Sequence, residues 1–340
     1  MQKRLSIQDY QQGILSGNRM ILSRAITLIE SNLTEDKALA QSVLESILPH
    51  TGEAVRIGIT GVPGVGKSTF IEAFGKYLTQ QGKRIAVLAI DPSSQLTKGS
   101  ILGDKTRMDE LSREPLAYIR PSPTGASLGG VTHKTRETML LCEAAGFEVI
   151  IIETVGVGQS ETFVHGMVDF FLLLMLAGAG DELQGIKKGI MEMADLIAIT
   201  KADSGNQHQA KLAQSEYQNA LHLFPPDGSG WFPEVVTCSA TEKNGIAKIW
   251  ELVEKHRTLL SKNGKFAENR QQQNLAWMHD FIRQSLEEKF YQNPQITTQI
   301  HSINKAVSEG KKLPIHAALE LLDTFYQQTP PNPPLEGRAF

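Results

Sequence analysis

The sequence predicts an α/β fold with a mostly parallel, doubly wound sheet, flanked by helical extensions at both ends. Two observations predict it. Between residues 50 and 262, short runs rich in β-branched residues alternate with stretches of helical periodicity. The short runs are almost continuously apolar, which is typical of parallel strands that are buried on both faces. Alternation of strand and helix favours a sheet covered by helices on both sides.

The order of these elements divides the chain into four parts. We predict an N-terminal helical extension (1–49), the domain that contains the sheet (50–262), a C-terminal helical arm (263–328) and a Pro-rich tail (329–340) that we expect to be disordered. The expected strands are Val55–Thr60, Arg84–Ile90, Leu116–Ile119, Val149–Glu153, Phe170–Leu176, Leu196–Thr200 and Glu234–Cys238. Outside the sheet domain, apolar residues three or four apart predict helices over Ile14–Ile29, Asp36–Leu48, Phe266–Phe290 and Ile300–Gln328.

The composition is that of an ordinary soluble protein. Hydrophobic residues make up 41% of the 340 residues and the net charge is -3, so neither a nucleic-acid-binding patch nor a membrane-surface patch is indicated. The two cysteines, Cys142 and Cys238, lie far apart, which argues against a disulfide framework or a metal site. The first residues lack the apolar segment of a signal peptide, and the apolar run Phe170–Leu176 is too short to span a bilayer. We therefore expect a cytoplasmic protein.

A glycine-rich segment follows the first expected strand and opens a helix. It reads Gly61-Val62-Pro63-Gly64-Val65-Gly66-Lys67-Ser68-Thr69. The segment matches G-x-x-x-x-G-K-[ST] in the strand–loop–helix context that this pattern requires. The glycines let backbone N–H groups approach phosphates, and the helix N-terminus adds the positive end of its dipole. We expect Lys67 to reach the β- and γ-phosphates and Ser68 to ligate Mg²⁺, which makes this a nucleoside triphosphate site.

Two later segments predict that the base is guanine. Thr200-Lys201-Ala202-Asp203 ends an expected strand, and Asp203 can accept hydrogen bonds from N1–H and the 2-amino group of guanine. Adenine would leave this carboxylate unpaired. The stem of Lys201 can pack over the base. Ser239-Ala240-Thr241 follows the last expected strand, where small residues let backbone N–H groups approach the base. We therefore assign GTP or GDP as the ligand.

Acidic residues with roles in metal binding are expected at the carboxyl ends of strands, where ligands of parallel sheets bind. Asp91 follows the second strand, Asp104 lies in a Gly-rich segment, and Glu153 ends the fourth strand. With Ser68, these oxygens suit Mg²⁺. Glu153-Thr154-Val155-Gly156 has the shape of a γ-phosphate sensor, in which Gly156 offers its N–H to the phosphate. Val157 stands where Ras-like enzymes carry a glutamine that positions water, so we predict slow intrinsic hydrolysis that a partner accelerates.

Several longer blocks together resemble the MeaB/ArgK family of GTPases, whose human member is linked to methylmalonic aciduria type A. They are GVPGVGKSTFIEAFG, DPSS with GSILGDKTRM, RPSPTGASLGG, LLCEAAGFEVIIIETVGVGQSE and GDELQGIKKGIMEMAD. The resemblance covers about residues 5 to 325. At Thr200 many members carry asparagine, and the threonine hydroxyl can still support the loop.

The resemblance implies a P-loop NTPase G domain of the SIMIBI class at 50–262 and a C-terminal arm that forms a homodimer. It implies a chaperone that uses GTP to gate cofactor loading and to protect an adenosylcobalamin-dependent acyl-CoA mutase, typically methylmalonyl-CoA mutase. It also implies that the loop from Gly178 to Lys188 is a third switch. The catalytic residues are then Lys67, Asp104, Glu153 and Lys188.

Two other functions stay open at the level of sequence. One is an ATPase or kinase associated with the transport of basic amino acids, a label that the family has carried. The guanine-type aspartate Asp203 and the lack of a kinase H-R-D loop argue against it. The other is a nickel metallochaperone GTPase, which would call for a cluster of cysteine and histidine that the sequence does not show.

Overall fold

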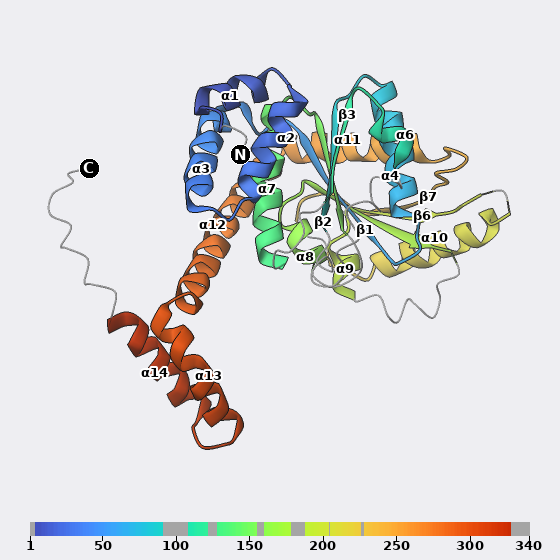
Figure 1. Ribbon diagram of the computed structural model, residues 1–340. Helices are drawn as coiled ribbons and strands as arrows, with labels where there is room; N and C mark the ends of the chain where they lie inside the picture. The colour runs from blue at the N-terminus through green and yellow to red at the C-terminus, as the bar shows by residue number, and fades with distance from the viewer. Residues whose placement is uncertain are drawn as a thin grey trace. The chain divides into compact units, whose positions relative to one another are not determined.

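The computed structural model describes residues 4–90, 108–121, 128–154, 160–177, 188–203, 205–225 and 228–327, without the side chains of 128–132, 160 and 188. The chain divides into two compact units, Met1–Gln273 and Asn274–Phe340. The first unit contains a seven-stranded sheet (Figure 1). No helix in the described part of the chain is long and apolar enough to cross a membrane.

All strand pairs of the sheet are parallel, in the order β3-β2-β4-β1-β5-β6-β7. The strands are β1 (Val55–Gly61), β2 (Ile85–Ile90), β3 (Ala117–Arg120), β4 (Val149–Thr154), β5 (Phe170–Leu176), β6 (Leu196–Thr200) and β7 (Glu234–Thr237). The predicted fold class is therefore confirmed, and every expected strand exists with ends that differ by at most a residue. The order reverses at β1, so the loop after β1 lies at the switch point where parallel sheets bind ligands.

Helices cover both faces of the sheet (Figure 1). One face packs against α4 (Lys67–Gln80), α6 (Asp109–Ser112), α9 (Lys188–Glu192), α10 (Gln207–Leu221) and α11 (Ile246–Lys262). The other packs against α7 (Leu128–Ala144) and α8 (Ser160–His165), and α1 (Ile7–Leu15), α2 (Arg19–Glu30) and α3 (Thr34–Ile47) pack against α7. Along β1, Ile57 and Ile59 face the first core while Gly58 lies against Val164 of the second. This alternation explains why the strands read as continuous apolar runs.

The N-terminal helices differ from the single helix expected over Ile14–Ile29. The chain breaks between α1 and α2 because Gly17 has a left-handed φ of 71° and Asn18 caps α2, accepting hydrogen bonds from the N–H groups of Met20 and Ile21. A short 3-10 turn, η1 (Leu48–His50), then leads from α3 toward β1.

The second unit contains most of α12 (Lys265–Tyr291), α13 (Pro294–Ser308) and α14 (Pro314–Gln327). The continuous helix expected over Ile300–Gln328 is wrong in its extent. Gly310, at φ 70°, ends the first helix, and Pro314 begins the next one, where its missing N–H costs nothing. The small core of this unit consists of Ile296, Ile303, Ala317 and Leu321. The predicted disordered tail lies outside the described residues.

Candidate functional site

The glycine-rich segment lies between the buried strand β1 and helix α4, as its sequence context predicted. Gly66 caps α4 in the left-handed region at φ 89°, and Gly64 has φ 79°, so both positions favour glycine. Val62 and Val65 are buried and anchor the loop, whereas Pro63 and Gly64 are exposed. The loop therefore presents its backbone to solvent at the N-terminus of a 14-residue helix, which is the arrangement that binds phosphates.

Lys67, Ser68 and Glu153 form a charged cluster beside this loop. Lys67 Nζ donates a hydrogen bond of 2.7 Å to the carbonyl of Gly61, and Ser68 Oγ donates one of 3.2 Å to Glu153 Oε1. Burial lowers the pKa of Lys67, and the nearby carboxylates of Glu153 and Glu161 raise it in part. The ammonium group of Lys67 and the carboxylates of Glu153 and Glu161 thus lie near the place where the γ-phosphate and its metal ion would bind.

The donor set suits Mg²⁺. The Ser68 hydroxyl and the Glu153 carboxylate are adjacent hard oxygen ligands, and Mg²⁺ in such sites takes few protein ligands beside water and phosphate. No group of three or more histidine, cysteine, aspartate or glutamate side chains that could hold a metal occurs among the described residues.

The loop after β6 is tied directly to the phosphate loop. Thr200 Oγ1 lies 2.8 Å from the carbonyl of Val65 and 3.2 Å from that of Met175, and Lys201 Nζ donates a hydrogen bond of 2.8 Å to the carbonyl of Gly64. Lys201 has a left-handed φ of 55°, uncommon for a residue other than glycine. The threonine hydroxyl thus supports the loop as expected, and the two segments of the site are held in one rigid arrangement.

Asp203 and the loop after β7 lie side by side. The hydroxyls of Ser239 and Thr241 both donate to Asp203 Oδ1, the latter at 3.1 Å. Ser239 is fully buried, and its N–H donates to the carbonyl of Asn244 at 2.9 Å. Two hydroxyls therefore orient the carboxylate of Asp203, and no described residue donates a hydrogen bond to its Oδ2.

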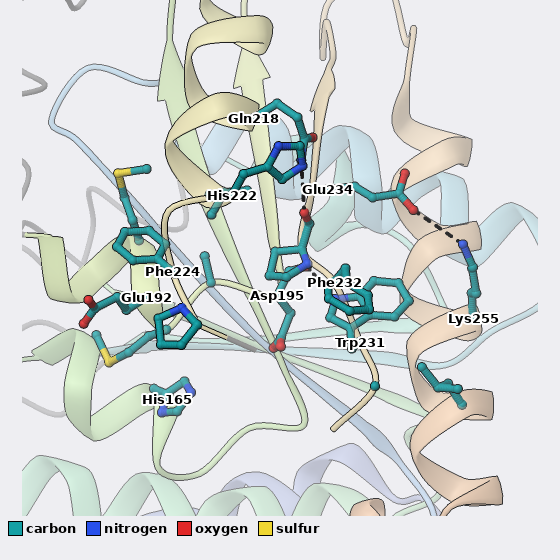
Figure 2. A pocket seen from close by; sticks show the side chains of 18 of the residues that line it. His165, Glu192, Asp195, Gln218, His222, Phe224, Trp231, Phe232, Glu234 and Lys255 are labelled. Atoms are coloured by element: carbon teal, nitrogen blue, oxygen red, sulfur yellow. Dashed lines mark hydrogen bonds and ion pairs between the residues drawn. The ribbon is translucent and has the colours of Figure 1, made fainter. Parts of the chain in front are cut away.

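A separate hollow of about 950 Å³ lies at the opposite edge of the sheet (Figure 2). Its lining includes Asp195, which directly precedes β6, and Glu234, which begins β7, so it lies at the amino ends of these strands. Trp231 forms one wall and donates from Nε1 to the carbonyl of Asp195 at 2.9 Å. None of the residues expected to bind nucleotide lines this hollow. The described ones lie instead near the carboxyl ends of the strands, in and around the loops after β1, β6 and β7.

Several expected site residues cannot be placed. Asp91, Asp104 and Gly156 lie outside the described residues, as do Val157 and most of the loop from Gly178 to Lys188. Lys188 begins α9, but its side chain is not described.

The sequence analysis missed Glu161, which is fully buried in α8 and interacts electrostatically with Lys67. In the sequence, only the position of Glu161 soon after Glu153 could have indicated that it lies near the nucleotide site.

Comparison with known proteins agrees with this geometry. The model of the family described as methylmalonyl Co-A mutase-associated GTPase MeaB matches residues 22–295. The chain belongs to the MeaB family of GTPases. A relative from Caulobacter vibrioides, named "Putative GTPase", is 49% identical over 94% of this chain and 98% of its own length. The mitochondrial methylmalonic aciduria type A homolog of Mus musculus is 46% identical over 92% of this chain and 78% of its own length.

A solved structure extends the agreement to three dimensions. The crystal structure of an LAO/AO transport system kinase is 37% identical, with a TM-score of 0.77, and the match covers 96% of this chain and 99% of that one. Membership of the MeaB family and the P-loop fold make this protein a GTPase that binds a nucleotide.

Proposed function

We propose that this protein is a GTP-dependent chaperone of an adenosylcobalamin-dependent acyl-CoA mutase, of the methylmalonyl-CoA mutase type. The nucleotide part of the proposal depends on one observation: the phosphate loop and the base loop are joined through Lys201 and Thr200, so phosphate and base sites form a single unit. The choice of client depends on the family description, which names a mutase-associated GTPase. A protein that cycles between GTP and GDP gates the loading of cofactor into the mutase and protects it from inactivation.

In the proposed mechanism, Lys67 leaves the carbonyl of Gly61 and binds the β- and γ-phosphates. Ser68, Asp91 and Asp104 would ligate Mg²⁺, and Glu153 would hold the ion through water. Bound Mg²⁺ would neutralise charge on the phosphates. Gly156 donates its N–H to the γ-phosphate, and Lys188 acts with the partner in hydrolysis.

Guanine recognition is assigned to Asp203, with Lys201 over the base and the Ser239–Thr241 segment at its edge. Because Asp203 Oδ1 accepts hydrogen bonds from two hydroxyls, the protein itself orients this carboxylate. This aspartate pairs with two donors of guanine that adenine lacks, which favours GTP over ATP by at least about 100-fold in kcat/KM.

We further propose that the protein is a homodimer through its C-terminal arm. Apolar residues at spacings of three and four follow one side of α12 and are about half exposed: Leu275, Met278, Ile282 and Leu286. Such a stripe pairs with an identical stripe on a second copy, as in a coiled coil.

Steady-state hydrolysis of GTP and ATP, alone and with a purified adenosylcobalamin-dependent mutase, tests the function. We expect slow, GTP-selective turnover that rises on addition of the mutase. Turnover that no mutase changes would remove the client, and a preference for ATP would favour the transport kinase named for the solved relative.

A single substitution sharpens the test of base recognition. In Asp203→Asn, the amide can donate to the second carbonyl of xanthine, so we expect GTP affinity to fall and XTP affinity to rise. Asp195→Asn, at the far edge of the sheet, is the control. Unchanged GTP selectivity in Asp203→Asn would contradict the assignment.

A further inference from the structure

The loop between α8 and β5, residues 166–169, is held by side chains from two other helices. Arg136 of α7 donates from Nη2 to the carbonyl of Gly166 at 2.8 Å. Gln273 of α12 donates from Nε2 to the carbonyl of Val168 at 2.8 Å. Arg136 also donates from Nη1 to the carbonyl of Gln273 at 3.4 Å. A single guanidinium therefore bridges the end of α8 and the beginning of α12.

The last residue of this loop carries the strongest contact. Asp169 accepts two hydrogen bonds of 2.7 Å from Nε and Nη2 of Arg270, a bidentate pair. Arg270 also donates to the carbonyls of Gly52 and Ala54, at 2.5 Å and 2.7 Å, just before β1. Asp169 Oδ2 in turn accepts the N–H of Arg56 at 2.8 Å. One turn of α12 is thus bonded to the residues just before β1 and β5, which are neighbouring strands in the sheet.

These contacts are shielded from water. Arg136 is 6% exposed, and the side chains of Asp169 and Arg270 are 4% and 13% exposed. Buried charges are stable only while their hydrogen bonds are made, so such a network has few alternative arrangements. A shift of the α8–β5 loop must therefore move the first turns of α12 with it or break several buried bonds.

The other end of α8 belongs to the nucleotide site. The helix begins at Ser160, soon after Glu153, whose carboxylate is bonded to Ser68. Glu161, in its first turn, is fully buried and interacts with Lys67. The γ-phosphate of GTP, which GDP lacks, would add negative charge beside Lys67, so the charge that faces Glu161 differs between the two nucleotide states. Helix α8 thus extends from the residues that respond to nucleotide to the loop that α12 holds.

We propose that Arg136, Arg270 and Gln273 form a clamp that couples α8 to the first turns of α12, so that exchange of GDP for GTP shifts α12. They are positioning residues, because none contacts the phosphate loop. The inference requires the GTPase cycle but neither the mutase nor the dimer, and α12 is the helix that continues into the second unit.

Hydrogen–deuterium exchange of the full-length protein tests the clamp, with GDP or the non-hydrolysable analogue GppNHp bound. In the wild type, we expect peptides over residues 160–169 and over 265–273 to differ between the two nucleotides. In Gln273→Ala, which removes the bond to Val168 but keeps the Asp169–Arg270 pair, the difference should persist at 160–169 and become smaller at 265–273. If Gln273 had only a structural role, the substitution would change hydrogen–deuterium exchange equally with GDP and with GppNHp bound.

Two further variants complete the experiment. Gln272→Ala removes the exposed neighbouring glutamine of the same helix and should behave as the wild type. Arg136→Lys keeps the charge but replaces the planar guanidinium, whose two Nη atoms bond the two carbonyls, by one ammonium nitrogen at a different position, so it should weaken the coupling of α12 as Gln273→Ala does. If Gln273→Ala fails to fold, the wild type and Arg136→Lys still decide. Absence of a nucleotide-dependent difference at 265–273 in the wild type, or an undiminished difference there in Arg136→Lys, would overturn the proposal.

Discussion

The two units of the chain bury their apolar side chains to very different extents. In the first unit, the strands of a parallel sheet are buried on both faces by two sets of helices. Among the described residues of the second unit, which end at 327, only Ile296, Ile303, Ala317 and Leu321 are buried, while many large apolar residues are exposed. These are Leu275, Met278, Phe281, Ile282, Leu286, Tyr291, Leu313, Ile315, Leu319, Leu322 and Tyr326.

This difference teaches that the units are stabilised in different ways. Folding is favoured by apolar area removed from water, at roughly 25 cal/mol per Å². The first unit meets that requirement within its own chain. The described residues of the second unit form a small core for their number of apolar side chains, which is why we propose that a partner covers the exposed ones. Chemistry and association should therefore respond to separate substitutions.

The largest expected effect is on the free energy of unfolding. It compares two arginines of α12, one in each unit, that each form an ion pair. Arg270→Ala leaves Asp169 buried without its partner and should lower the free energy of unfolding by about 3–5 kcal/mol. Arg283→Ala removes an exposed pair with Asp280 and should cost less than about 1 kcal/mol. Urea unfolding measures both, and equal costs would contradict the contrast between the units.

Loss of the phosphate-binding lysine should abolish chemistry without affecting association. Lys67→Ala removes the cation that meets the γ-phosphate, so we expect kcat for GTP to fall by about 100- to 1,000-fold. Sedimentation should show the same oligomeric state as the wild type. A change of that state would show that the units are not separable.

A substitution in the exposed apolar stripe of α12 should weaken association and leave GTP hydrolysis unchanged. Ile282→Glu places a charge among apolar residues and should raise the dissociation constant of the dimer by about 10- to 100-fold. Gln271→Glu introduces the same charge at an exposed polar position of α12 and is the control. Analytical ultracentrifugation provides the measurement, and an unchanged monomer–dimer equilibrium would count against the proposed interface.

The smallest expected effect depends on pH. Burial raises the pKa of Glu137 on α7 from 4.5 to about 7, and Lys134 lowers it in part. Between pH 4.5 and 7 the folded state binds more protons than the unfolded state, so this residue lowers stability as pH rises. Glu137→Gln should therefore stabilise the first unit by about 1–2 kcal/mol at pH 8, with partial exposure allowed for, and by little at pH 4.5. Glu287→Gln, at an exposed site in the second unit, should show no such pH dependence in urea unfolding.

The sheet could be predicted from the sequence because its physical cause is local. A strand buried on both faces needs a run of apolar residues, and Phe170–Leu176 appears in the structure with the bounds that its composition indicated. The helix boundary near Gly310 was missed because helical periodicity continues across it. Gly310 and Pro314 together were the available signal.

The candidate site was predictable where it depends on motif spacing. Lys67, Ser68 and Thr200 lie where the pattern of the phosphate and base loops indicated. The clamp could not be predicted, because Arg136, Asp169 and Arg270 are far apart in sequence and each alone looks like an ordinary surface charge. Only the packing of α7, α8 and α12 brings them together.

The bonds from Thr200 and Lys201 to the phosphate loop have a consequence for the rate of nucleotide exchange. Both bonds join groups of the protein itself, so they order the two loops independently of contacts to a nucleotide. Binding of a nucleotide then costs little free energy for ordering these loops, and its release does not require their disruption. We therefore expect spontaneous replacement of GDP by GTP, without the exchange factor that many regulatory GTPases require.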